Sequence, residues 1–397
     1  MFTEQKLFNR NFVLLSLCNL TFTTSFNLIL PVLPLYLTDD LGASKTVLGL
    51  ILACYSVAAL LMRPISGWLV DSFPRRRILI IFMIPFCFSF IGYIFLSYFL
   101  LIAMLRFMHG LAFGAVGTTV STMAVDTIPL NKLGTGVGFL GITNSLSMAI
   151  GPMLGMLLLD YISFNQIFLV CTAIALVSFG IGLLVKLPRT EAAQPGRGVH
   201  LENFFLRHGL GAFGCLLLAA LPYGLMINFI SIYVREHGIN INPGYYFCVL
   251  AAGLVISRLF SGKLIDLGFL TQSVVCGQVL NIVAFICFIL FHGDLAFFGS
   301  AFLMGLGYGI ISPAYQTMLL LLADAEHRGT ASSTFLIAWD LGIGASVLIG
   351  GWFADLTSLN TTFWSGTALQ GASTIIFGLV VAQSYRRRRQ LQLEAAG

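Results

Sequence analysis

The sequence predicts an all-helical membrane protein with twelve transmembrane helices arranged as two pseudo-symmetric six-helix bundles. Hydrophobic residues make up 58% of the 397 positions and charged residues only 9%, so there is too little polar surface to cover a water-facing globule. Apolar runs such as 78–107 and 210–234 exceed the ~20 residues that an α-helix needs to cross about 30 Å of hydrocarbon. A membrane β-barrel would instead show ~10-residue segments of alternating hydrophobicity.

Turn residues and charges divide the apolar runs into twelve expected helices. The first run follows Lys6 and Arg10, as a signal peptide would, but no clear small-residue cleavage site follows it. We therefore expect it to be retained as the first helix. The expected spans are 12–36, 46–68, 78–97, 99–125, 135–158, 164–186, 208–234, 243–264, 273–291, 295–322, 331–353 and 360–384.

Basic residues are unevenly shared between the two sides of this arrangement. The outer connections hold few of them, including Lys45 and Arg235. By the positive-inside rule, we expect a multi-pass protein of the cytoplasmic (inner) membrane with both termini in the cytoplasm. The run Arg386–Arg389 is then an anchor, with binding of anionic lipid as the alternative. The basic residues expected on the cytoplasmic side are Arg75, Arg76, Arg77, Lys132, Lys186, Arg189, Arg197, Arg207, Arg328 and Arg386–Arg389.

The longest polar segment, 187–206, divides the chain. Proline and glycine at Pro188, Pro195, Gly196 and Gly198 interrupt helical continuity there. We expect an N-terminal six-helix bundle over 1–186, a cytoplasmic linker over 187–206 and a C-terminal six-helix bundle over 207–397.

The two halves repeat each other at an offset of 195 residues. Positions 63–71 (RPISGWLVD) and 258–266 (RLFSGKLID) share five identities in nine. Glycines follow the same offset, with Gly110 matching Gly305 and Gly114 matching Gly309. Such a duplication implies a pseudo-two-fold axis along the membrane normal and a substrate path between the halves. A duplicated structural scaffold is the alternative.

Several other classes of protein are excluded by what the sequence lacks. Eight cysteines are scattered without a C-x-x-C motif or a nearby histidine pair, so we expect no metal and no cofactor. The formal charge of +5 comes from basic residues between apolar runs, so no nucleic-acid partner is expected. H-E-x-x-H, G-x-S-x-G and G-x-x-x-x-G-K-[ST] motifs are absent. We expect a monomer that is not an enzyme.

The connection after the second expected helix carries a family resemblance. Its sequence, GWLVDSFPRRR over 67–77, resembles the G-x-L-x-D-R-x-G-R-R loop of the major facilitator superfamily. Ser72 and Pro74 depart from the basic residue and the glycine of that pattern. The resemblance implies a twelve-helix transporter without enzymatic activity.

This loop suggests a gate on the cytoplasmic side. We expect Gly67 to allow close packing and Asp71 to meet the N-terminal dipole of helix 11 around 331–333. A charge cluster that breaks when the halves rock would hold that side closed. A purely topological basic loop is the alternative. The expected gating residues are Gly67, Asp71, Arg75 or Arg76 paired with Asp126, and the second-copy residues Arg258 and Asp266.

Two further stretches add to the resemblance. Arg106-Phe-Met-His109-Gly110 in the fourth helix is similar to the R-x-x-Q-G motif of the family, with histidine in place of glutamine. Gly151-Pro152-Met-Leu-Gly155 in the fifth helix resembles the G-x-x-x-G-P-x-x-G motif of its antiporters, with Ser147 at the leading glycine position. That helix is expected to be kinked at Pro152 and to pack against helix 8, which limits leak. Leu30-Pro31-Val32-Leu33-Pro34 resembles the x-P-x-x-P element of twelve-helix drug:proton antiporters.

Asp340 is the leading candidate for the proton carrier. It lies twelve residues beyond Arg328, about 18 Å along a helix and near the bilayer midplane. Arg106 is about 12 Å below the outer surface and should face a cavity or an acid, unless it snorkels to the interface. His109 is a candidate proton relay or a satisfied buried histidine. A permanent bridge from Asp340 to Arg106 or His109 is the alternative to titration.

Few charges line the expected substrate cavity, which favours a small amphipathic organic substrate over a polyanion. The leading interpretation is a secondary active transporter that exports such molecules across the inner membrane by proton antiport with alternating access. The alternative is a proton symporter that imports a sugar or another small nutrient. The expected cavity residues are Asn27, Arg106, Asn144, Tyr223, Asn228, Tyr308, Trp339 and Asp340.

Overall fold

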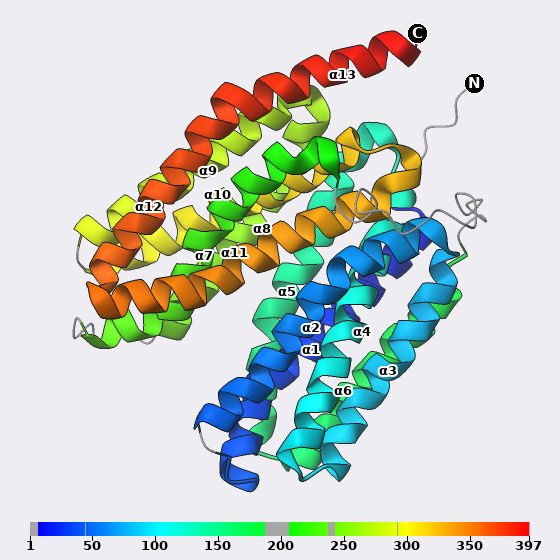
Figure 1. The fold of residues 1–397 in the computed structure, drawn as a ribbon, viewed down its shortest axis with the longest axis vertical. Coiled ribbons are helices and arrows are strands. Elements are labelled where there is room, and N and C mark those ends of the chain that lie inside the picture. The colour runs from blue at the N-terminus through cyan, green and yellow to red at the C-terminus, as the bar shows by residue number, and fades with distance from the viewer. Residues whose placement is uncertain (1–6, 44, 187–205, 237–242, 292, 397) are drawn as a thin grey trace. The chain divides into compact units, whose positions relative to one another are not determined.

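The computed structural model describes residues 7–43, 45–186, 206–236, 243–291 and 293–396, and they form two compact units (Figure 1). Unit 1 takes its described residues from Met1–Leu130, Thr143–Phe204 and Glu326–Ser333. Unit 2 takes its described residues from Asn131–Ile142, Phe205–Ala325 and Thr334–Gly397. The expected linker 187–206 lies outside the described residues apart from Leu206, so that division of the chain stays a prediction.

Unit 1 is built mainly from the first six long helices. Within it, α2 packs on α4, α1 on α6, and α3 on both α4 and α6. The elements are α1 (Arg10–Leu35), η1 (Tyr36–Asp40), α2 (Lys45–Ser72), α3 (Arg75–Phe95), α4 (Phe99–Asp126), the later part of α5 (Leu133–Leu159) and α6 (Phe164–Leu184).

Unit 2 repeats this packing plan, because α8 packs on α10, α7 on α12, and α9 on both α10 and α12. Gly268, with a φ of 94°, separates α8 from α9. The elements are the first part of α5, η4 (Arg207–Gly209), α7 (Leu210–Glu236), α8 (Pro243–Leu264), η5 (Ile265–Phe269), α9 (Leu270–Leu290), α10 (Asp294–Leu322), most of α11 (Arg328–Leu356), α12 (Leu359–Ile376), η7 (Phe377–Val381) and α13 (Ala382–Ala396). The short η6 (Ala325–His327) lies at the boundary, with Ala325 in unit 2 and its other two residues in unit 1. The short η2 (Leu130–Lys132) precedes α5.

The all-helical prediction is confirmed, and the helix ends have local causes. Asn9 accepts a hydrogen bond from Phe12 N at the start of α1, and Ser163 forms a capping box with Gln166 at the start of α6. These side chains satisfy amide groups that a first helical turn leaves unpaired. The observed bounds of α8 equal the predicted 243–264.

The predicted end of the last helix at 384 is wrong, because helical structure continues through η7 and α13 to Ala396. The segment 382–396 contains neither glycine nor proline and is rich in arginine, glutamine and alanine. These residues favour helix even where the hydrophobic pattern has ended.

Close contact between helices recurs at equivalent positions of the two units. A Cβ atom at Gly110 of α4 would overlap the Tyr55 carbonyl of α2, and one at Gly305 of α10 would overlap the Leu250 carbonyl of α8. Both pairs follow the offset of 195, since 110 and 55 become 305 and 250. Glycine is therefore required where the two most closely packed helices of each unit meet.

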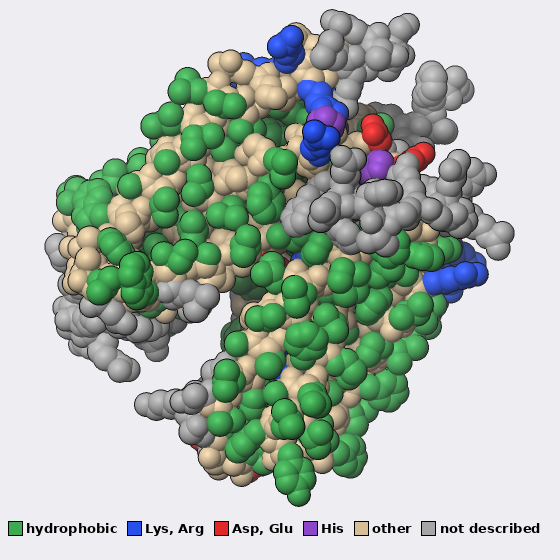
Figure 2. All heavy atoms as spheres, in the orientation of Figure 1, with side chains coloured by type: hydrophobic (Ala, Val, Ile, Leu, Met, Phe, Trp, Pro, Cys, Tyr) green, Lys and Arg blue, Asp and Glu red, His purple; other side chains and the backbone are tan. Residues whose placement is uncertain are grey.

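Eleven segments of the described residues are long and apolar enough to cross a membrane. One of them, Tyr245–Leu290, spans 46 residues and contains both α8 and α9, which agrees with a twelve-helix fold. Figure 2 shows hydrophobic side chains over much of the visible face, while Lys and Arg gather at a few places. An apolar outer surface of this kind is suited to lipid.

Candidate functional site

The start of α11 is held by an aspartate of α2 inside unit 1. The Asp71 carboxylate accepts hydrogen bonds from Gly329 N at 2.7 Å and from Thr330 N and Oγ1 at 2.8 Å each. The first amide groups of a helix have no partner within the helix and carry its positive dipole end. A carboxylate accepts hydrogen bonds from these amide groups, and its negative charge is favourable at the positive end of the dipole. The sequence placed the partners of Asp71 around 331–333, whereas the structure has the donors at Gly329 and Thr330.

Gly67 makes this contact sterically possible. A Cβ atom at this position would overlap the Ser333 hydroxyl and would lie 3.1 Å from the Gly329 carbonyl oxygen. Glycine one turn before Asp71 thus lets α2 reach the first turn of α11.

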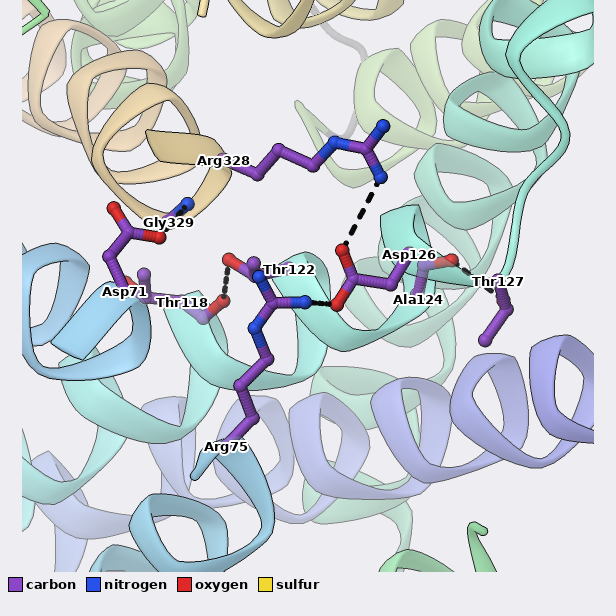
Figure 3. A network of polar contacts seen from close by, with 9 residues as sticks. All are labelled: Asp71, Arg75, Thr118, Thr122, Ala124, Asp126, Thr127, Arg328 and Gly329. Atoms are coloured by element: carbon purple, nitrogen blue, oxygen red, sulfur yellow. Dashed lines mark hydrogen bonds and ion pairs between the residues drawn. The ribbon is translucent and has the colours of Figure 1, made fainter. Parts of the chain in front are cut away.

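Three further charges adjoin this capped helix start (Figure 3). Asp126, at the end of α4, forms ion pairs with Arg75 of α3 and with Arg328, the latter at 3.4 Å. The side chains are 16%, 8% and 21% exposed, respectively. Two carboxylates, including that of Asp71, and two guanidinium groups give this cluster no formal net charge. We call Asp71, Arg75, Asp126 and Arg328 the charged junction.

Arg76 does not share in this cluster. Its Nη2 atom donates to the Leu183 carbonyl oxygen at 2.9 Å, at the end of α6, and the side chain is exposed. Of the two arginines considered for pairing with Asp126, the structure places Arg75 there.

A second helix start is held in the same way inside unit 2. The Asp266 carboxylate accepts from Gly134 N at 2.6 Å, from Thr135 N at 2.9 Å and from the Thr135 hydroxyl. A Cβ atom at Gly262 would lie 2.5 Å from Thr135 Cα. The Arg258 guanidinium donates to the carbonyl oxygen of Gly141, which lies further along α5. We call this contact of Asp266 with the start of α5 the second junction.

The two junctions share their cap but differ in their surroundings. With the offset of 195, the charged residues at 75, 126 and 328 correspond to Leu270, Leu321 and Leu133. Leu270 and Leu133 are buried, with 3% and 4% exposure. The three charged residues that adjoin the first helix start therefore have leucines as their counterparts in the repeat.

Arg106 and His109 of α4 lie in an aromatic cluster within unit 1. Their side chains are 1% and 0% exposed. The Arg106 guanidinium carbon is 4.6 Å from the ring centroid of Tyr55 and 5.6 Å from that of Phe26. Tyr93 Oη lies 3.2 Å from His109 Nδ1. Other rings beside His109 belong to Phe86 and Phe90.

Part of the hydrogen-bonding capacity of this cluster is unused. Within the described part of the chain, Arg106 Nε and Nη1 and His109 Nε2 are buried without hydrogen-bond partners. Arg106 does not snorkel to an interface. Its burial is costly unless another group supplies acceptors.

The antiporter-like stretch of α5 packs on α1. A Cβ atom at Gly151 would lie 2.6 Å from Asn27 Cβ, and one at Gly155 would overlap the Leu28 carbonyl. The expected packing on helix 8 is found earlier in α5, at Gly134 and Gly138. Helix α5 is shared between the two units. Its first residues belong to unit 2, and its later residues, including Pro152, belong to unit 1.

Two of the predicted cavity asparagines take part in the α1–α5 contact. Asn27 donates to the Ser147 hydroxyl at 2.8 Å, and Asn144 accepts from Asn19 at the same distance. Ser147 occupies the position of the missing motif glycine and uses its hydroxyl there. This is a contact that a search for glycines cannot reveal.

The predicted residues of unit 2 form a separate aromatic group. The ring of Tyr223 is 4.6 Å from that of Tyr308 and 5.2 Å from that of Trp339, and Tyr308 donates to the Ala219 carbonyl oxygen at 2.9 Å. Asp340 follows Trp339 and is partly buried. Asn228 is exposed and donates to Gly224 O in its own helix.

Sequence reasoning did not find Tyr55 and Phe26, which contact Arg106. No local motif marks them, and the repeat gives no signal because the position equivalent to Tyr55 holds Leu250. The only hint is the close approach at Gly110, which places the α2 backbone at Tyr55 against α4.

Two helical units with the same packing plan and with apolar outer faces are typical of a membrane transport protein. A family model described as Major Facilitator Superfamily matches residues 15–271 and 249–396, and the chain belongs to this family.

Its curated relatives include proteins named as exporters. The staphylopine export protein of Staphylococcus aureus is 23% identical over 80% of this chain and 83% of its own length. A multi-drug resistance efflux pump PmrA homolog of Lactococcus lactis is 22% identical over 93% of this chain and 94% of its own. The human organic anion transporter MFSD10 has the same fold, with a TM-score of 0.79 and 17% identity over 93% of this chain and 99% of that structure.

Proposed function

We propose that this transporter exports small amphipathic organic molecules across the inner membrane in exchange for protons. The relatives named as exporters support the direction. Aspartate-capped starts of α11 and α5 support alternating access, because such contacts can be made and broken as a unit. The proposal takes the chain as a monomer with both termini in the cytoplasm and with bundles over 1–186 and 207–397 joined by 187–206.

The observation that carries the proposal is the charged junction. Asp71 binds the first turn of a helix whose remainder belongs to unit 2. A gate of this kind holds one conformation through hydrogen bonds and ion pairs, and it opens without breaking a packed hydrophobic core. We assign gating to the charged junction with Gly67 and Arg76, and to Arg258 and Asp266 in the second half.

Proton coupling is assigned to three residues, Asp340, His109 and Arg106. Asp340 is the acid of α11 nearest the middle of the helix, which runs from Arg328 to Leu356. A carboxyl group that is neutral while facing one side and charged while facing the other exchanges a proton for each substrate moved. The substrate is assigned to Asn27, Asn144, Tyr223, Asn228, Tyr308 and Trp339 together with Arg106.

The test is transport into proteoliposomes under an imposed pH gradient. Antiport predicts that an acidic vesicle interior drives uptake of a transported compound, whereas symport of a nutrient predicts that an acidic exterior drives it. Asp340→Asn should abolish the gradient-driven component. Asp294→Asn, the same change at an exposed aspartate in the first turn of α10, should leave it intact. Undiminished driven uptake in Asp340→Asn would reject this residue as the proton carrier.

A further inference from the structure

Arg106 is a buried cation without a counter-charge among the described residues of its own unit. Arginine keeps its proton under all ordinary conditions in proteins, and its guanidinium here is 1% exposed with Nε and Nη1 lacking partners among the described residues. Uncompensated charge in such surroundings is strongly unfavourable. Tyr93 forms a side-chain hydrogen bond with Arg106, but the described part of unit 1 provides no anionic group for the remaining N–H groups.

The described acids of the N-terminal half lie at helix ends rather than within the helices. Between residues 7 and 186 they are Asp39, Asp40, Asp71, Asp126 and Asp160, all at or beyond the ends of helices. Asp126 is on the same helix, but the twenty residues that separate it from Arg106 correspond to about 30 Å. It is also already shared by two other arginines.

We propose that the missing group is a carboxylate of the exported molecule and that the substrate is an organic acid with an apolar or aromatic body. The inference rests on the proposed function and deepens it. An arginine with free N–H groups recognises a planar carboxylate through charge-assisted hydrogen bonds. The faces of Tyr55 and Phe26, which flank the guanidinium, suit the apolar part of such a molecule.

The neighbouring histidine provides a second donor. When Tyr93 donates to Nδ1 of neutral His109, the ring proton is on Nε2, which is also buried and without a partner in the described residues. Arg106 and His109 are three residues apart on α4 and so lie on the same face of the helix. The aromatic cluster is not sealed, because Tyr55 and Phe113 are partly exposed.

The second unit has no copy of this site. At the equivalent positions Arg106, His109 and Tyr55 are replaced by Ala301, Met304 and Leu250. Carboxylate recognition is therefore confined to one half, and we expect one acid bound per protein molecule.

The experiment compares an acid with its uncharged analogue. Binding of 2-naphthoate and of 2-naphthamide to the full-length protein in lipid nanodiscs is measured by isothermal titration without a pH gradient. We expect wild type to bind the acid at least about tenfold more tightly than the amide, as one charge-assisted contact provides. Arg106→Gln should reduce this ratio to near one, and Arg106→Lys should keep part of it.

Arg63→Gln is the matched control. Arg63 is a buried arginine of α2 that lies over Phe113 and donates to the Gly114 carbonyl oxygen at 3.4 Å. Because this donor already has an acceptor, the change should leave the acid-to-amide ratio at the wild-type value. Loss of the ratio in both variants would indicate a general charge effect and overturn the proposal.

Two further outcomes would overturn it. Equal binding of acid and amide by wild type would exclude a carboxylate receptor, whatever the variants do. Acid binding that appears only in Asp340→Asn would show that Asp340 occupies Arg106 in the resting protein. The binding assay has no pH gradient, so its result bears on carboxylate recognition alone. Proton antiport is tested separately by the proteoliposome assay.

Discussion

Asp71→Asn is expected to loosen the start of α11 while leaving the start of α5 unchanged. The carboxylate accepts three hydrogen bonds there, whereas the amide has one acceptor oxygen and presents a donor to the remaining N–H and O–H groups. Loss of the hydrogen bonds to one carboxylate oxygen costs roughly 0.5–1.5 kcal/mol, and loss of a charge at a helix start roughly 0.3–1 kcal/mol. The sum of about 0.8–2.5 kcal/mol corresponds to roughly a 4- to 70-fold shift in the equilibrium between capped and uncapped states.

Hydrogen exchange measures this shift directly, because Gly329 N and Thr330 N are the amides that Asp71 binds. Where reclosing is fast, the exchange rate of peptides covering 326–333 should rise by the same factor. Asp266→Asn is the matched variant and should raise exchange in peptides covering 131–138 instead. Equal acceleration at both helix starts in either variant would refute the reasoning, and so would no acceleration at either.

The remaining predictions concern the same region of unit 1. Gly67→Ala should accelerate exchange in 328–333 without altering any charge, because the added methyl group overlaps Ser333 and forces α2 away; a matching loss of substrate transport checks its role in gating. Asp126→Asn should lower the melting temperature, since two arginines lose their shared anion. Simultaneous leucine substitutions at 75, 126 and 328 should restore most of the lost melting temperature, because the equivalent positions of the repeat hold leucine. Raising NaCl from about 0.05 to 1 M should accelerate exchange at 328–333 more than at 131–138, because screening acts on the partly exposed ion pairs; equal acceleration contradicts an ionic contribution.

The sequence predicted the fold well because the lipid environment leaves few choices. Long apolar runs must be helical in a membrane, and glycine, proline and charge clusters mark their ends, as at Pro243 and Leu264 of α8. The repeat also pairs Asp71 with Asp266, and each of them caps the start of a helix. What the repeat alone could not reveal is that Arg75, Asp126 and Arg328 form ion pairs at the first helix start, because their counterparts at 270, 321 and 133 are leucines.

The candidate site was harder to predict, since its contacts link helices that are far apart in sequence. Arg106 could be recognised as a costly residue from its position within an apolar run. Its aromatic neighbours could not, because Tyr55 and Phe26 depend on how α1 and α2 pack on α4. The donors bound by Asp71 were misplaced by two residues for a similar reason: α11 begins at Arg328, whereas the apolar pattern suggested 331.

The capped helix starts also impose an order on biosynthesis. The chain emerges from its N-terminus, so Gly134 and Thr135 already exist when Asp266 is synthesised, and the second cap can form once α8 is complete. Asp71 has no such partner waiting, because Gly329 and Thr330 follow it by 258 and 259 residues. Arg75, Asp126 and the start of α11 can therefore assemble only after most of the second half has been made. The charged junction can therefore be completed only late in the synthesis of the chain.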